Sequence, residues 1–335
     1  MNRRTLSFVA IITIVCIFSL ALVVTAQRQP ELSSSTNAAN PQSQQKPRPK
    51  RMEDFDIRAN LDRTLSAPSE GNEAQGRYVA AARDSQLRRE RPSVQMRFSS
   101  VTGAPSRVYS FTQELTQASN ADAEATSKQF LKRNNDLFRL RGDEVDGLRA
   151  ARRYRSDHNG VTHLTLQQQV NNIEVFQGDY TFHLDRSGAI LAASGELVPL
   201  ASSLANASRP QLAVNAALRK AMEYADAELA NDAAIKSQAT SNEQRQRLSQ
   251  SEKFAQDVEA RLVYFPLTGD QLRLAWEFTM WMQETPDVYL MVVDADNGAL
   301  LYRDNQTWYC FEDGKEPGAV ATGSARTSNL SSSNA

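Results

Sequence analysis

The fold of this chain is decided by HLTLQQQVNNIEVFQGDYTFHLDRSGAIL, which runs from His163 to Leu191. Apolar and polar residues alternate in its first part, as expected for a half-buried strand. One side would carry Leu164, Leu166 and Val170, and the other Val161, His163, Thr165, Gln167 and Gln169. Asn171-Asn172 predicts a turn, YTFHLD alternates again, and Ser187-Gly188 predicts a second turn. The stretch therefore predicts an antiparallel meander with one face on a core.

The residues before this meander predict a helix to cover it. Asn120 or Asp122 can cap a helix through AEATSKQFLKRNNDLF. Further upstream, residues 74–89 predict an amphipathic helix and SVQMRFSS predicts a strand. A helix on an antiparallel meander is an α+β arrangement.

A second half repeats the same order. Ser208 is expected to start a helix, with Pro210 in its first turn and Gln211 in the capping-box position. Residues 231–251 are polar and predict an exposed helical or mobile insertion. Three strand-like segments follow, which are ARLVYFPL, QLRLAWEFTMWMQ and DVYLMVVDADNGALLYR. Turns are expected at residues 268–270 and 296–298. The repeated order predicts two related modules.

Composition and the chain ends indicate a protein exported from the cell. The 335 residues are 41% hydrophobic with a net charge of -1, which supports a core and argues against nucleic-acid or membrane-surface partners. Arg3 and Arg4, an apolar run and Val24-Thr25-Ala26 predict a signal peptide over residues 1–26, with an uncleaved anchor as the alternative. A secreted or periplasmic location would follow. Residues 27–51 predict a disordered linker and residues 310–335 a disordered tail.

The sequence shows no catalytic constellation. It lacks HExxH, GxSxG and a phosphate-binding loop, and no carboxylate stands in a context that predicts a shifted pKa. His158, His163 and His183 are spaced along strands and turns. His163 and His183 could meet across the sheet near Asp185, but exposed strand histidines are usually plain surface residues. Cys310, the one cysteine after the signal, has no nearby histidine; it is a free thiol or pairs with another chain. We therefore predict no catalytic residue, metal site or cofactor.

Two longer stretches resemble the fungalysin/thermolysin propeptide domain. They are FLKRNNDLFRLRGDEVDGL and GVTHLTLQQQVNNIEVFQGDYTFHLDRSGAILAASGELVP. The shared features are a Leu-Phe-x-Leu helix end, a Gln-rich strand, an N-G-I-x-V turn, a Gly-Asp pair and a closing D-x-x-G. Asn172 stands where the family usually has glycine, a tolerable exchange at a turn. Residues 52–200 would form this domain, and residues 206–309 resemble a PepSY-like second half of such propeptides.

The resemblance implies an α+β fold of two cystatin-like/PepSY-like modules, each a helix on an antiparallel meander. It also implies a non-catalytic inhibitor and/or folding chaperone of a fungalysin-type zinc metallopeptidase. The partner would be the peptidase catalytic domain, in cis or in trans. Two alternatives stay open: a truncated peptidase precursor without its catalytic domain, and an extracellular module that binds an unrelated protein.

Overall fold

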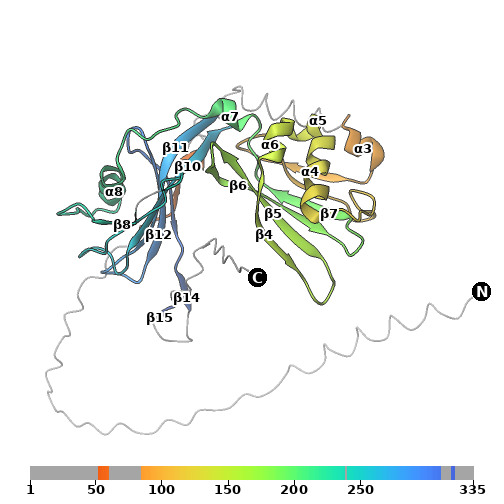
Figure 1. Cartoon of the computed structure of the whole chain (residues 1–335). Coiled ribbons are helices and arrows are strands. Elements are labelled where there is room, and N and C mark those ends of the chain that lie inside the picture. The colour runs from red at the N-terminus through yellow and green to blue at the C-terminus, as the bar shows by residue number, and fades with distance from the viewer. Residues whose placement is uncertain (1–51, 60–83, 238–239, 311–317, 321–335) are drawn as a thin grey trace, which may run out of the picture. The chain divides into compact units, whose positions relative to one another are not determined.

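The structure, a computed structural model, describes residues 52–59, 84–237, 240–310 and 318–320 (Figure 1). Every described residue lies in one compact unit, within residues 49–335. The predicted signal peptide, the linker and most of the predicted 74–89 helix fall outside the described residues. None of the described helices is long and apolar enough to cross a membrane.

The first half of the described unit is a six-stranded antiparallel sheet covered on one face by short helices. The strands lie in the order β4-β5-β6-β7-β3-β2. The elements are α3 (Gln86–Glu90), β2 (Gln95–Phe98), β3 (Pro105–Tyr109), α4 (Ala123–Arg133), α5 (Asn135–Phe138), α6 (Gly142–Asp146), β4 (Arg149–Arg155), β5 (Thr162–Val170), β6 (Ile173–Leu184) and β7 (Ile190–Gly195). Buried side chains from α4, α5 and the sheet form one core, including Phe130, Phe138, Leu164, Tyr180 and Phe182.

The second half is another antiparallel sheet, with helix α8 against β11 and β12. Its elements are α7 (Ala201–Leu204), α8 (Val214–Glu223), β8 (Ile235–Ser237), β9 (Gln246–Leu248), β10 (Val258–Thr268), β11 (Gln271–Trp281), β12 (Val288–Asp294), β13 (Leu300–Asn305) and the edge strand β1 (Phe55–Asp56). A second core contains Leu218, Met222, Tyr264, Trp276 and Phe278. Farther along, β14 (Trp308–Cys310) pairs with β15 (Gly318–Val320).

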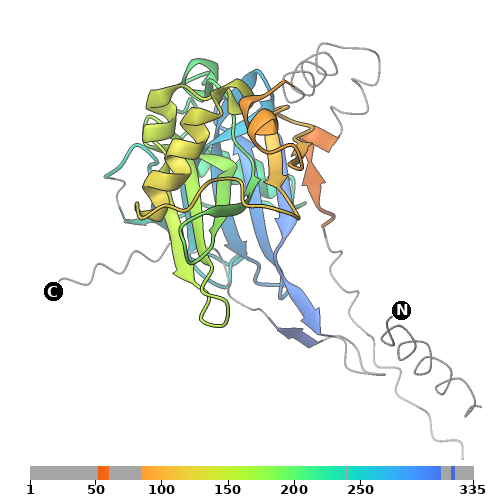
Figure 2. The ribbon, with the colours of Figure 1, turned by 90° about the vertical axis from the view of Figure 1, so that its right-hand side faces the viewer.

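Strand β6 joins the two halves. Its C-terminal part pairs with β5 and β7, while Val175 near its start pairs in parallel with Tyr264 of β10. Gln177, between these two parts, has a left-handed backbone (φ 54°). Figure 2 shows the described elements from a second side, with the helices of the first half over their sheet.

The structure confirms the α+β class and several local predictions. Asp122 caps α4 through a hydrogen bond from the Glu124 amide to Oδ1 (2.8 Å). Asn171 and Asn172 both have positive φ (53° and 60°), which is the backbone that a tight turn between antiparallel strands requires. This geometry explains why asparagine can replace glycine at position 172. The division into two cystatin-like or PepSY-like modules, 52–200 and 206–309, stays a prediction.

Two predictions for the second half are wrong. Helix α8 begins at Val214 rather than at Ser208, because the amides of Gln211 and Leu212 both donate to the carbonyl of Ala295 (3.0 and 2.9 Å) and hold this segment against the β12–β13 turn. The described residues between 231 and 251 contain no helix, so the helical alternative for this insertion is wrong. They contain the β8–β9 hairpin, in which β9 extends the sheet beside β10 and buries Leu248.

Candidate functional site

The outward face of the first sheet, away from the helices, carries most of the polar residues that the sequence singled out. The strand register aligns them in two rows that cross all six strands. The first row is Tyr154, His163, His183, Ala192, Tyr109 and Gln95, and the second row is Arg152, Thr165, Thr181, Ser194, Arg107 and Arg97. Strands lie about 4.8 Å apart, so each row is about 24 Å long. We call these the outward rows.

The two strand histidines meet in the first of these rows. Their Nδ1 atoms are 2.7 Å apart, and Nε2 of His163 lies 3.0 Å from Oγ of Ser156. The Tyr154 ring stacks on His163 with ring centroids 4.6 Å apart. Asp185 does not join the pair, because its Oδ1 accepts hydrogen bonds from the amides of Ser187 and Ala189 within the turn.

This pair lacks the further ligands of a metal site. The described residues contain no group of three or more histidine, cysteine or acidic side chains that could hold a metal ion. His158 lies exposed in the turn after β4. Two imidazoles with their Nδ1 atoms in contact make a hydrogen-bonded pair in which one ring donates and the other accepts.

The histidine pair predicts that acid weakens the fold. Burial, the nearby His163 and the nearby Arg107 together lower the pKa of His183. Below about pH 6.5 the unfolded chain binds a proton at this residue while the folded chain resists it, so the free energy of unfolding should fall as the pH drops through that value. Urea titrations between about pH 7.5 and pH 5.5 would measure this slope. The slope should shrink in His183→Phe and persist in His158→Phe; equal slopes in all three proteins would refute the prediction.

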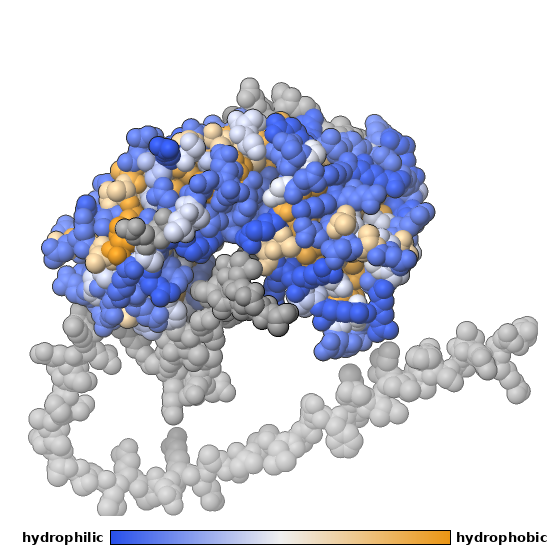
Figure 3. Space-filling view, in the orientation of Figure 1, coloured by the Kyte–Doolittle hydropathy of each residue, from blue (hydrophilic) through white to orange (hydrophobic). Residues whose placement is uncertain are grey.

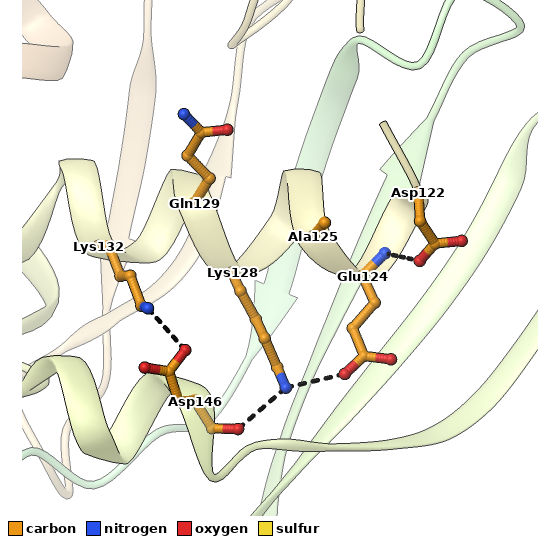
Figure 4. A pocket seen from close by; sticks show the side chains of 7 residues that line it. All are labelled: Asp122, Glu124, Ala125, Lys128, Gln129, Lys132 and Asp146. Atoms are coloured by element: carbon orange, nitrogen blue, oxygen red, sulfur yellow. Dashed lines mark hydrogen bonds and ion pairs between the residues drawn. The ribbon is translucent and has the colours of Figure 1, made fainter. Parts of the chain in front are cut away.

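A surface pocket of about 550 Å³ lies between α4 and α6 (Figure 4). Its charged side chains neutralise one another: Lys128 pairs with Glu124 (2.8 Å), and Lys132 pairs with Asp146 (2.6 Å). Lys128 also donates to the carbonyl of Asp146 (3.0 Å). Lys128 and Lys132 thus link α4 to α6, and both lysines of the pocket are engaged in ion pairs.

A largely buried charge network lies where β6 meets β10. Glu174 of β6 contacts both Arg149 of β4 and Arg261 of β10, and the Arg261 Nε donates to Glu277 of β11 (2.6 Å). Burial alone would raise the pKa of Glu174, but the charges and hydrogen bonds of Arg261 and Arg149 outweigh it and hold that pKa below its usual range. No context in the sequence predicted this lowered pKa, because Arg149 and Arg261 are distant from Glu174 along the chain.

Glu196, just after β7, is another carboxylate with a shifted pKa. Burial raises its pKa, although a hydrogen bond from the Thr102 hydroxyl (2.8 Å) partly offsets that effect. Sequence reasoning missed these acids because their partners lie far away along the chain.

Gln168 is a buried polar residue that the sequence pattern placed on neither side of its strand. Its side chain exchanges two hydrogen bonds with the backbone of Val198 (2.7 and 2.8 Å). The strict alternation of Leu164, Leu166 and Val170 puts position 168 on the apolar side, so that signal was present in the sequence.

Comparison with known proteins supports the resemblance for part of the first half. Residues 146–197 match the family described as "Fungalysin/Thermolysin Propeptide Motif". This segment runs from the end of α6 to just beyond β7 and contains β4, β5, β6 and β7. The outward rows therefore lie largely within the matched residues.

Two curated relatives are peptidases. The chain is 22% identical to the bacillolysin of Brevibacillus brevis over 204 residues, which is 60% of this chain and 35% of that protein. It is 26% identical to the thermostable neutral protease NprT of Geobacillus stearothermophilus over 191 residues, 57% of this chain and 30% of that protein. The chain thus spans about a third of the length of these relatives.

A solved structure, the Bacillus megaterium YpeB C-terminal domain, aligns with 63% of this chain and 76% of its own length, at 14% identity and a TM-score of 0.28. The sequence match is more specific, because it falls on the strands that carry the quoted turns. Residues 146–197 therefore match a propeptide motif of the fungalysin/thermolysin type.

Proposed function

We propose that this chain is a non-catalytic, propeptide-like protein that binds a fungalysin/thermolysin-type zinc metallopeptidase as an inhibitor and/or folding chaperone. The observation that carries this proposal is the propeptide match at residues 146–197, which falls on the continuous sheet β4–β7. The partner would be the peptidase catalytic domain, in cis or in trans. We also propose an extracellular or periplasmic location, which rests on the sequence features of residues 1–26.

The geometry suits binding by surface complementarity. An inhibitor of this kind needs a stable, extended surface and no reactive groups of its own. The outward face of the first sheet has hydroxyl, imidazole, guanidinium and aromatic side chains in regular rows. In Figure 3 the described surface is mostly hydrophilic, with hydrophobic residues showing between the polar ones.

A direct inhibition and refolding assay tests the proposal. The purified chain is mixed with the active neutral protease of Geobacillus stearothermophilus, and hydrolysis of a peptide substrate is followed at increasing chain concentration. We expect saturable inhibition with a dissociation constant of about 1–100 nM, the range of stable protein complexes of standard size. In parallel, the chain should raise the yield of active enzyme when the denatured catalytic domain is refolded.

Two controls give the assay its meaning. A serine peptidase should be unaffected by the chain, and mass spectrometry should show the chain intact at the time of inhibition, because a cleaved competitor substrate also slows hydrolysis. Absence of both inhibition and improved refolding, with several metallopeptidases of this type, would refute the proposal. Chelator-sensitive hydrolysis of casein by the chain alone would instead show that it is an enzyme.

A further inference from the structure

The outward rows concentrate positive charge on one face of the first sheet. The second row holds three exposed arginines, Arg97, Arg107 and Arg152, and neither row contains an acidic residue. Among the described residues no carboxylate forms an ion pair with any of the three. By contrast, two arginines elsewhere on β4 are paired, Arg149 with Glu174 and Arg153 with Asp122. The chain as a whole has a net charge of -1, so this row is a local excess.

The strand register makes this excess of positive charge destabilise the sheet. Arg97 of β2 lies directly opposite Arg107 of β3. Like charges at directly opposed positions of an antiparallel pair destabilise the sheet, whereas opposite charges there stabilise it. Arg107 also contributes to lowering the pKa of His183 in the neighbouring row. A solvated sheet face with no further role would not need this arrangement, because any neutral side chain at position 97 would remove the repulsion.

The residues between the arginines suit a protein partner. The middle of the second row presents hydroxyl groups, and the Oγ1 atoms of Thr165 and Thr181 are 2.9 Å apart. Tyr154 lies at one end of the first row, with the guanidinium of Arg152 over its ring at 4.8 Å. Arginine and tyrosine are the residue types that most often anchor protein interfaces. Three arginines spread over about 24 Å supply fewer phosphate contacts than a nucleic-acid groove requires.

We propose that the outward rows are a docking surface for an acidic patch on a protein partner, with Arg97 and Arg107 pairing to its carboxylates. This inference rests on the proposed function and identifies the partner surface as part of the peptidase catalytic domain. Binding would bring negative charge between the two opposed arginines and relieve their repulsion. The hydroxyl groups of the second row would then lie against the partner's polar backbone and side chains.

Arg97→Glu separates a docking role from a structural one. If Arg97 docks the partner, the variant should be more stable than the parent chain and yet inhibit less well. The new glutamate would face Arg107 across the strands, so the midpoint of thermal unfolding should rise. The same change should weaken inhibition of the Geobacillus stearothermophilus neutral protease by at least about tenfold, since it places like charges together in the complex. The double variant Arg97→Glu/Arg107→Glu should weaken inhibition by about 100-fold. Arg209→Glu, an exposed arginine outside the rows, is the matched control and should inhibit like the parent chain.

Salt dependence gives a second readout. Inhibition by the parent chain should weaken as salt is raised from about 0.05 to 0.5 M, and inhibition by the double variant should depend on salt much less. If the parent inhibits and both charge-reversed variants inhibit equally well, the docking surface is wrong and the proposed function stands. If the parent neither inhibits several metallopeptidases of this type nor improves their refolding, both the docking surface and the proposed function fall. Tighter binding of heparin than of the peptidase, lost in the same variants, would identify a polyanion site and would overturn the inference.

Discussion

Replacing Arg261 with alanine is expected to lower the free energy of unfolding by about 3–5 kcal/mol, because it leaves two mostly buried carboxylates without their shared cation. The side chains of Glu174 and Glu277 are only 12% and 11% exposed. Arg149 would still contact Glu174, but Glu277 would lose Arg261, the one ion-pair partner it has among the described side chains. Urea denaturation, with the slope compared between proteins, measures the loss.

Two further variants define what the network does. Lys132→Ala removes a cation from an exposed ion pair, whose partners are 43% and 63% exposed, and should cost at most about 1 kcal/mol. The triple variant Glu174→Leu/Arg261→Met/Glu277→Leu should recover much of the loss, because a well-packed apolar cluster often replaces a buried ion network at little cost. If Arg261→Ala is no more harmful than Lys132→Ala, the buried network does not stabilise the junction of β6 and β10.

Phe182→Ala should be comparably damaging, at about 3–5 kcal/mol, because it empties the centre of the first core. The side chain is fully buried and meets the rings of Phe130 (centroids 6.2 Å apart) and Tyr180 (5.4 Å). Phe111→Ala is the matched control: that ring is 87% exposed, so its removal should change stability by no more than about 0.5 kcal/mol. Thermal and urea unfolding of the three proteins would give the comparison.

Hydrogen exchange on Phe182→Ala also tests the prediction of two modules. If residues 52–200 and 206–309 are separate cooperative units, protection should fall in β4–β7 and persist in β10–β13. Phe278→Ala, in the second core, should give the reverse pattern. Equal loss of protection in both sheets for either variant would contradict two modules and show one cooperative unit coupled through β6.

Local predictions succeeded where neighbouring residues decide the structure. The Asp122 cap, the Asn171-Asn172 turn and the alternation in β5 and β6 each depend on a few adjacent positions. The prediction of where α8 starts failed because the amides of Gln211 and Leu212 donate hydrogen bonds to the carbonyl of Ala295, more than eighty residues away. The prediction of a helix in residues 231–251 failed for the same reason. The short polar strands of the β8–β9 hairpin are stabilised by the pairing of β9 with β10, which lies outside this segment.

In the candidate site, too, the sequence predicted what adjacent residues decide and missed what distant residues decide. The sequence pattern placed His163 and His183 on one polar face, but only the pairing of β5 with β6 showed that their rings touch. The opposition of Arg97 and Arg107 could not be anticipated, because it depends on the register of β2 with β3 and on the bulge between Arg97 and Phe98. No spacing rule within the sequence reports a pairing register across a turn of irregular length.

By itself, the sequence determined the meander, the polar and apolar sides of its strands, and the resemblance to a propeptide, because each of these is encoded by residue types at short, regular spacings. The tertiary structure alone decided that β6 serves both sheets, that Glu174 bridges Arg149 and Arg261, and that three arginines share one row. These features are contacts between residues far apart in the chain, and their free energies are set by burial and strand register.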